Sequence, residues 1–201
     1  MKDYLIVGFG FAGSSFAHLL EKNQKSFVVF NDNPAPVTTV AGAMFNPIIL
    51  KRFTAVWKAQ EQMHLLVPFF SEIEKKLATP LLHKVRVFRK FTSVEEKNNW
   101  FVASDKPILS EYLSTEIINE LSPCISTPFG LGEVLHTGMI NTRNLIPTYQ
   151  KKLEKEGKFF EEKFDYNTLE IKENSICYKG ISAKKIIFCE GYGMVNNPFF
   201  N

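Results

Sequence analysis

Three glycines near the N-terminus have the types and spacing of a phosphate-binding turn. They lie in the hexapeptide Gly8-Phe9-Gly10-Phe11-Ala12-Gly13, which matches G-x-G-x-x-G. In this pattern the first glycine permits a tight turn, the second lets the backbone approach a pyrophosphate, and the third lets a helix pack closely on a strand. The helix N-terminus offers N–H groups and the positive end of its dipole. The motif therefore predicts a dinucleotide-binding site formed by these six residues, with an ordinary glycine turn as the alternative.

A polar residue after the second strand is the other part of this fingerprint. An acidic side chain is expected about 20 residues after the glycines, where it binds ribose hydroxyls. Asn31 has the usual spacing, and Asp32 follows one place later. Either side chain is able to bind a hydroxyl, although both belong to an Asn-Asp-Asn-Pro sequence that also suits a plain turn. No arginine follows directly, which disfavours a 2′-phosphate and hence NADP.

The glycine motif is flanked by the elements that a nucleotide-binding unit requires. The apolar run at 4–7 predicts a strand buried on both faces, residues 12–22 predict a helix, and residues 26–30 predict a second buried strand. This order makes a right-handed βαβ unit. A late apolar run at 186–189, before Gly191, predicts another strand of the same sheet. The predicted fold class is α/β, a Rossmann-like parallel sheet.

The segment between these parts predicts an inserted α+β portion. Further helices are expected at 54–77, 93–100 and 141–156, and further strands at 82–91, within 117–140 and within 159–178. Pro68 is expected to kink or split the longest helix. No element is expected after residue 193. The predicted domains are residues 1–80 as the first part of the dinucleotide-binding domain, 81–137 as an inserted portion of a second domain, and 138–201 as the continuation of the first.

Four segments of the chain occur in a characteristic order. They are the Gly8–Gly13 turn, the small-residue loop Val40-Ala41-Gly42-Ala43-Met44-Phe45-Asn46-Pro47, the segment His136–Asn141, and the segment Ile186–Gly193. In this order they resemble the D-amino acid oxidase/glycine oxidase superfamily of FAD-dependent oxidoreductases. The resemblance spans nearly the whole chain, and it implies that the cofactor is FAD.

The same resemblance implies roles for residues outside the glycine motif. It implies that Val40, Ala41, Gly42, Ala43 and Met44 run beneath the flavin and the pyrophosphate, where large side chains would collide. It also implies that the backbone near Phe164 meets the adenine, and that Gly191 lets the late turn pass close to the cofactor. Each glycine taken alone also suits an ordinary turn.

The chain departs from the family pattern in two ways. Glu190 stands where such proteins usually have a small or hydroxyl residue. The family also continues past the position of Asn201, with a substrate-carboxylate arginine and a final glycine-rich flavin loop. We therefore expect this chain to be an N-terminal fragment or a truncated product.

The resemblance implies an oxidoreductase that moves a hydride from a substrate amine to flavin in the complete protein. The expected ligands are FAD and a small amino acid or amine. No catalytic acid–base pair is identified, because in such chemistry the cofactor carries out the redox step. The alternatives are a nicotinamide-dependent dehydrogenase and a non-catalytic dinucleotide-binding fragment. Activity of the 201 residues alone is left open.

Composition sets limits on the other classes of function. The net charge of +3 and the interleaving of basic and acidic residues argue against a nucleic-acid partner. The three cysteines are far apart, as in a cytoplasmic protein with reduced thiols, and the four histidines lack metal-ligand spacing. No apolar run is long enough to span a bilayer. The oligomeric state is not predicted.

Overall fold

The computed structural model describes residues 1–32, 37–40 and 43–200 of the chain. It divides into two compact units. Unit 1 consists of Met1–Ala41, Lys75–Thr79 and Thr142–Asn201, and unit 2 consists of Gly42–Glu74 and Pro80–Asn141. The predicted domain limits at residues 80 and 137 differ from these divisions and stay a prediction about the complete protein.

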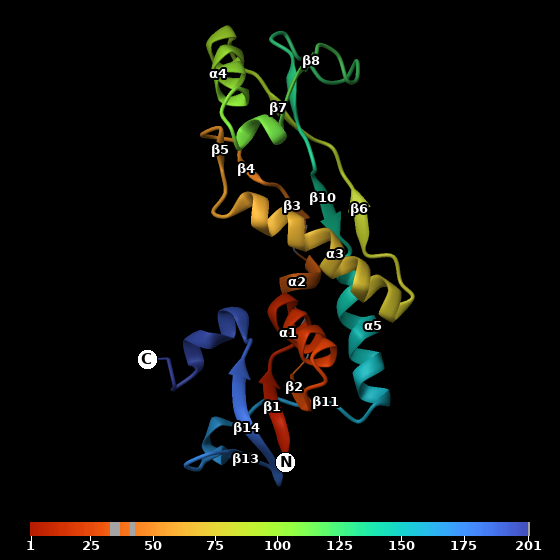
Figure 1. The fold of residues 1–201 in the computed structure, drawn as a ribbon, viewed down its shortest axis with the longest axis vertical. Helices are drawn as coiled ribbons and strands as arrows, with labels where there is room; N and C mark the ends of the chain where they lie inside the picture. The colour runs from red at the N-terminus through yellow and green to blue at the C-terminus, as the bar shows by residue number, and fades with distance from the viewer. Residues whose placement is uncertain (33–36, 41–42, 201) are drawn as a thin grey trace. The chain divides into compact units, whose positions relative to one another are not determined.

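Unit 1 contains the sheet that the sequence predicts (Figure 1). Its strand order is β11-β2-β1-β14-β13-β12. The first four strands are parallel to one another, whereas β13 runs antiparallel to β14 and to β12. The strands are β1 (Lys2–Val7), β2 (Phe27–Asn31), β11 (Phe159–Glu161), β12 (Glu170–Ile171), β13 (Ile176–Tyr178) and β14 (Ile181–Phe188). The predicted α/β fold class, with a mainly parallel sheet, is confirmed.

The middle parts of the central strands are apolar at consecutive positions, as in Leu5–Val7 and Phe27–Phe30, because both faces of the sheet are covered there. Side chains alternate along a strand, so Leu5 and Val7 face one core while Ile6 faces the other. The first core contains Phe164, which stacks on the ring of Tyr178 with centroids 4.2 Å apart. On unit 1's helical side lie α1 (Phe11–Lys22) and α5 (Thr142–Lys155), which contact each other.

Unit 2 is built from small antiparallel sheets and two helices. Its sheets have the orders β3-β10-β6, β7-β9-β8 and β4-β5. The strands are β3 (Met44–Phe45), β4 (Ile48–Ile49), β5 (Thr54–Ala55), β6 (Leu82–Lys84), β7 (Val87–Lys90), β8 (Leu113–Ile118), β9 (Leu131–Val134) and β10 (Gly138–Ile140). The helices are α3 (Ala59–Leu77), whose last turn belongs to unit 1, and α4 (Val94–Ser104). Shorter helices of the chain are α2 (Val37–Val40), η1 (Leu109–Glu111), η2 (Tyr166–Thr168) and η3 (Gly191–Asn196).

A buried tryptophan organises the core of unit 2. Trp100 is completely buried, and its Nε1 donates a hydrogen bond of 2.8 Å to the carbonyl of Ser114. The rings of Phe53 and Phe91 meet it edge-on. Gly132 lies against the indole, where a Cβ atom would come within 2.6 Å of the ring. The helix expected at 93–100 is present as α4, and Ser93 caps it, because its Oγ accepts a hydrogen bond from the Glu96 N–H.

Several element predictions were wrong in their limits. The long helix begins at Ala59 rather than at residue 54, because Thr54–Ala55 forms a strand paired with Ile48–Ile49. It continues through Pro68 without being split, as the burial of Phe70 and Ile73 compensates for one missing backbone hydrogen bond. The strand expected at 82–91 is two strands in different sheets, and the short helix η3 follows the last strand.

Candidate functional site

A cavity of about 1100 Å³ lies at the carboxyl ends of the parallel strands of unit 1. The βαβ connection places β2 on one side of β1, and β14 lies on the other side, so the cavity is at the point where the strand order reverses. Open α/β sheets bind ligands at such a point. The lining residues are Val7, Gly8, Phe9, Gly10, Phe11, Ala12, Phe30, Asn31, Asp32, Thr38, Lys163, Phe164, Asp165, Tyr166, Cys189, Glu190, Gly191, Tyr192, Gly193 and Asn196.

The three glycines of the motif have different surroundings. Gly8 has a φ of +92°, and a Cβ there would lie 2.4 Å from the carbonyl oxygen of Cys189. A Cβ on Gly13 would lie 2.2 Å from the carbonyl oxygen of Gly8. A Cβ on Gly10 would lie 3.0 Å from the Thr38 hydroxyl, the one group within 4 Å among the described residues beyond its chain neighbours and its own helix. Gly8 and Gly13 therefore allow close packing, while Gly10 keeps the N-terminus of α1 accessible, as a bound pyrophosphate requires.

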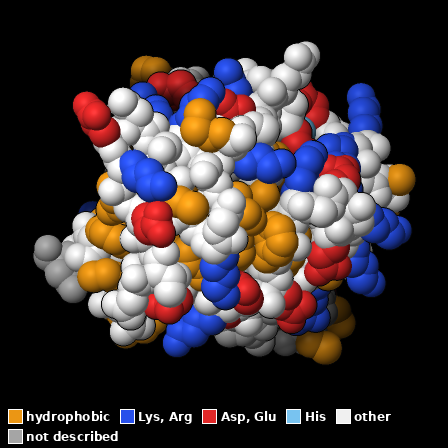
Figure 2. Space-filling model, turned by 90° about the horizontal axis from the view of Figure 1, so that it is seen from below, with side chains coloured by type: hydrophobic (Ala, Val, Ile, Leu, Met, Phe, Trp, Pro, Cys, Tyr) orange, Lys and Arg blue, Asp and Glu red, His pale blue; other side chains and the backbone are white. Residues whose placement is uncertain are grey.

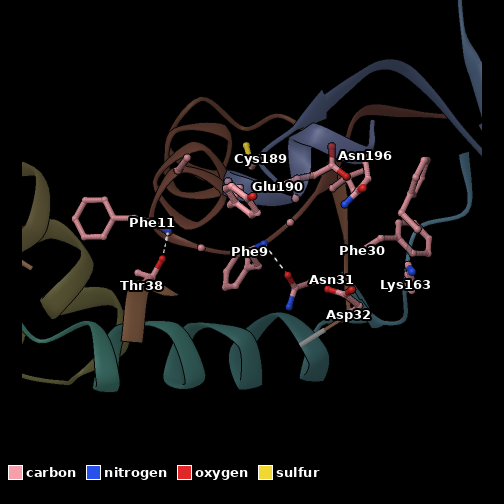
Figure 3. A pocket seen from close by; sticks show the side chains of 18 of the residues that line it. Phe9, Phe11, Phe30, Asn31, Asp32, Thr38, Lys163, Cys189, Glu190 and Asn196 are labelled. Carbon is pink, nitrogen blue, oxygen red and sulfur yellow. Dashed lines mark hydrogen bonds between the residues drawn. The ribbon is translucent and has the colours of Figure 1, made fainter. Parts of the chain in front are cut away.

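Two side chains hold the glycine turn in place (Figure 3). The Oδ1 atom of Asn31 accepts a hydrogen bond of 3.0 Å from the Phe9 N–H. The Thr38 hydroxyl accepts one of 3.3 Å from the Phe11 N–H. Asn31 thus fixes the turn with its oxygen, and the exposed Asp32 next to it is the acidic group at the end of β2. Sequence reasoning missed Thr38, whose signal is a hydroxyl residue just before the small-residue loop.

The carboxylate of Glu190 is fixed by two neutral donors. The Tyr166 hydroxyl donates to its Oε1, and the Asn197 Nδ2 donates to its Oε2 over 2.6 Å. Asn197 is completely buried, so this amide has a fixed position. Tyr166 contacts the rings of Phe164 and Phe188. The bond therefore ties the segment after β11 to the end of β14.

The titratable groups of the cavity favour binding over proton transfer. Burial, the hydrogen bond to Glu190 and the charge of Asp32 raise the pKa of Tyr166 well above its ordinary value. Burial and the charge of Glu190 raise the pKa of the Cys189 thiol. Both groups therefore stay protonated near neutral pH, and the thiol has little nucleophilic thiolate.

The structure brings together most of the predicted cofactor-binding residues. The cavity wall contains Gly8, Phe9, Gly10, Phe11, Ala12, Asn31, Asp32, Phe164 and Gly191. Gly13 is buried behind the turn, and Val40 is exposed on α2 in unit 1. Ala43 and Met44 belong to unit 2, while Ala41 and Gly42 lie outside the described residues. These assignments to the cofactor stay predictions.

The described part of the chain was considered for metal-ligating clusters and for membrane-spanning helices. No group of three or more histidine, cysteine, aspartate or glutamate side chains within 1–32, 37–40 and 43–200 is placed to hold a metal ion. Over the same ranges, no helix has the length and apolar character needed to cross a membrane.

The fold is shared with solved structures of amino acid and amine oxidases. The chain superposes on glycine oxidase from Geobacillus kaustophilus with a TM-score of 0.66 and 14% identity, covering 94% of this chain and 55% of the other. It superposes on iminodiacetate oxidase from Chelativorans sp. BNC1 with a TM-score of 0.64 and 14% identity, covering 92% of this chain and 54% of the other. It superposes on L-amino acid deaminase from Proteus vulgaris with a TM-score of 0.66 and 12% identity, covering 94% of this chain and 47% of the other. No family model matches the sequence.

These comparisons confirm at the level of the fold the resemblance that the four segments indicate. The chain spans about half of the length of the solved structures it matches, since it covers 55%, 54% and 47% of the three chains compared above.

Proposed function

We propose that unit 1 binds the ADP part of FAD, and that the complete protein is an FAD-dependent oxidoreductase acting on an amino acid or an amine. The observation that carries the proposal is the cavity at the sheet's switch point, into which the glycine turn and the N-terminus of α1 open. The fold shared with glycine oxidase and L-amino acid deaminase supports the choice of FAD and of this substrate class.

Each part of the cavity wall has a role in this proposal. Gly10 and the first turn of α1 hold the pyrophosphate, with the Thr38 hydroxyl beside them. Asp32, after β2, accepts hydrogen bonds from the ribose, and the backbone at Phe164 lies along the adenine. When bound, FAD supplies a flavin ring that accepts a hydride from the substrate. The residues of this chain orient the nucleotide and exclude water from it.

The surface charge and the cysteines bear on the partner and the location of the protein. On the face shown in Figure 2, Lys and Arg side chains alternate with Asp and Glu, so no continuous basic surface suits a nucleic acid there. We propose a small amino acid or amine as the substrate of the complete protein. We place the protein in the cytoplasm, because its three cysteines are free thiols.

Titration of the purified chain with FAD tests the proposal. Saturable quenching of flavin fluorescence, reversed by ADP, is expected, with weaker binding of NADH. The variant Thr38→Val keeps the side-chain shape but removes one polar partner, and we expect about a 3- to 10-fold weaker affinity for FAD. Thr168→Val is the matched control, because the Thr168 hydroxyl is exposed, donates to the Asp165 carbonyl and lies outside the cavity lining.

Two results would contradict the proposal. The first is no binding of FAD or ADP by the folded chain. The second is tighter binding of NADH than of FAD, which would favour the nicotinamide-dependent dehydrogenase. Equal losses of FAD affinity in Thr38→Val and Thr168→Val would show that the Thr38 hydroxyl does not belong to the nucleotide site.

A further inference from the structure

Glu190 places a carboxylate in the cavity wall where the resemblance leads one to expect a small or hydroxyl residue. It lies two residues after the end of β14 and lines the cavity together with Asp32 and Asp165. Figure 3 labels Glu190 and Asp32 in the cavity wall. Among the described lining residues, Lys163 is the single lysine or arginine. The charged groups of the wall are therefore mainly acidic, which is unusual for a site that must accept a pyrophosphate.

The negative charge of Glu190 is positioned without being neutralised. Its two partners, the Tyr166 hydroxyl and the Asn197 amide, are uncharged donors. The Asn197 Oδ1 accepts a hydrogen bond of 3.0 Å from the Phe199 N–H, which fixes the orientation of this amide. A carboxylate has about four acceptor positions, so two bonds leave it able to accept hydrogen bonds from a ligand.

Asp32 and Glu190 act on the same region of the cavity. They follow strands on opposite sides of β1, since β2 precedes Asp32 and β14 precedes Glu190. Tyr166 lines the same cavity as both of them, and its hydroxyl donates to Glu190. A group bound beside Tyr166 therefore experiences two negative charges, one from each side of the sheet's switch point.

We propose that Glu190 determines nucleotide specificity. With Asp32 it accepts hydrogen bonds from the hydroxyls of an unphosphorylated adenosine ribose, and it repels a nucleotide that carries a further phosphate there. The inference rests on the proposed function, because it requires an adenine dinucleotide in the cavity. Its physical basis is the repulsion between a dianionic phosphate and two carboxylates, of which Glu190 is held by two donors and is partly buried, so that its charge is screened less than in water.

The experiment compares two ligands that differ only in one phosphate. Binding of ADP-ribose and of 2′-phospho-ADP-ribose is measured by calorimetry with the full chain and three variants. Glu190→Gln keeps the shape of the side chain and its acceptor oxygen but removes the charge. Tyr166→Phe removes the hydroxyl and leaves the charge. Glu173→Gln is the matched control, because Glu173 is an exposed carboxylate outside the cavity lining.

We expect the unmodified chain to bind ADP-ribose more tightly than its 2′-phosphorylated form. Glu190→Gln should reduce this preference about tenfold, mainly by tighter binding of the phosphorylated ligand. Tyr166→Phe and Glu173→Gln should change the preference by less than about twofold. A preference in Glu190→Gln within about twofold of the unmodified value would overturn the inference while leaving the proposed function intact.

Failure of the proposed function has a different result. If the folded, unmodified chain binds neither ligand, the proposed function fails, and the inference fails with it. If the unmodified chain binds both ligands equally well, the nucleotide site stands and Glu190 is not a specificity residue. Thermal unfolding of each variant shows that the proteins compared are folded.

Discussion

A carboxylate lies near each end of helix α1, and the two carboxylates differ in the charge of their hydrogen-bond donors. Near its C-terminal end, Glu21 receives hydrogen bonds from Lys76, Lys152 and Tyr149. Its N-terminal end opens into the cavity, where Glu190 has two uncharged donors. The first carboxylate has its charge matched by ammonium groups, and the second keeps its charge available. The difference separates a group that stabilises the fold from one that selects a ligand.

The cluster around Glu21 ties three separate segments of unit 1 together. Lys76 donates to Glu21 over 2.5 Å, and Lys152 donates to its other oxygen over 2.8 Å. Lys76 also donates to the Tyr149 hydroxyl over 2.7 Å. Burial alone would raise the pKa of Glu21, but the hydrogen bonds from Lys152, Lys76 and Tyr149 lower it to about 2. Burial lowers the pKa of Lys76, so part of the stabilisation is offset.

The comparison predicts its largest difference when each carboxylate is neutralised. Glu21→Gln leaves the partly buried ammonium group of Lys76 without its anion, while Lys152 keeps its ion pair with Glu156. It should lower the free energy of unfolding by about 3 kcal/mol. Glu190→Gln should lower it by less than about 1 kcal/mol, because the Asn197 amide keeps donating to the remaining oxygen and the Tyr166 hydroxyl is able to accept from the new NH2 group. Urea denaturation followed by circular dichroism measures both values. Similar losses in the two variants would show that the two carboxylates have the same role.

The pH dependence of stability provides a second test at Glu21. Because folding lowers the pKa of Glu21, the stabilisation is present above its ordinary pKa of 4.5 and is lost as the pH falls through about 2. We expect the midpoint of urea unfolding to fall more steeply with acidification between these pH values in the unmodified chain than in Glu21→Gln. The difference should amount to at most about 3 kcal/mol. Parallel pH profiles in the two proteins would contradict the assignment.

Local sequence patterns predicted the parts of the site that are local in the structure. The Gly8–Gly13 turn follows from its spacing, and the central strands follow from short apolar runs buried on both faces. The strand at Thr54–Ala55 was missed, because its two residues gain their structure from pairing with Ile48–Ile49. Strands this short have almost no periodicity of their own.

The contacts that define the cavity join residues far apart in the sequence. Thr38 bonds to the Phe11 N–H across 27 residues, and Tyr166 bonds to Glu190 across 24. No spacing rule relates such pairs, since loop conformation brings them together. The sequence therefore identified Glu190 as a departure from the family pattern, whereas its two donors required the structure.

The N-terminal end of α1 should affect ligand binding more than stability. Among the described residues other than its chain neighbours and its own helix, a Cβ on Gly10 would come within 4 Å of the Thr38 hydroxyl alone, at 3.0 Å. We expect Gly10→Ala to change the free energy of unfolding by less than about 1 kcal/mol. It should weaken FAD binding about tenfold, because the methyl group occupies space beside the N-terminus of α1. Urea denaturation and fluorescence titration measure the two effects, and unchanged FAD affinity in the folded variant would contradict the site.

The last comparison removes one tyrosine hydroxyl from the surroundings of each carboxylate, Tyr149 beside Glu21 and Tyr166 beside Glu190. Tyr149 is completely buried, and its hydroxyl accepts from Lys76 and donates to Glu21 over 2.5 Å. Tyr149→Phe should therefore cost about 1 to 2 kcal/mol of stability, since it leaves charged groups short of a partner. Tyr166→Phe should cost less than about 1 kcal/mol, because Asn197 still bonds to Glu190. The two variants contain the same chemical change, so their difference in urea midpoint isolates the surroundings. An equal or larger loss in Tyr166→Phe would mean that the hydrogen bond to Glu190 contributes mainly to folding, and that the carboxylate in the cavity is held there for stability.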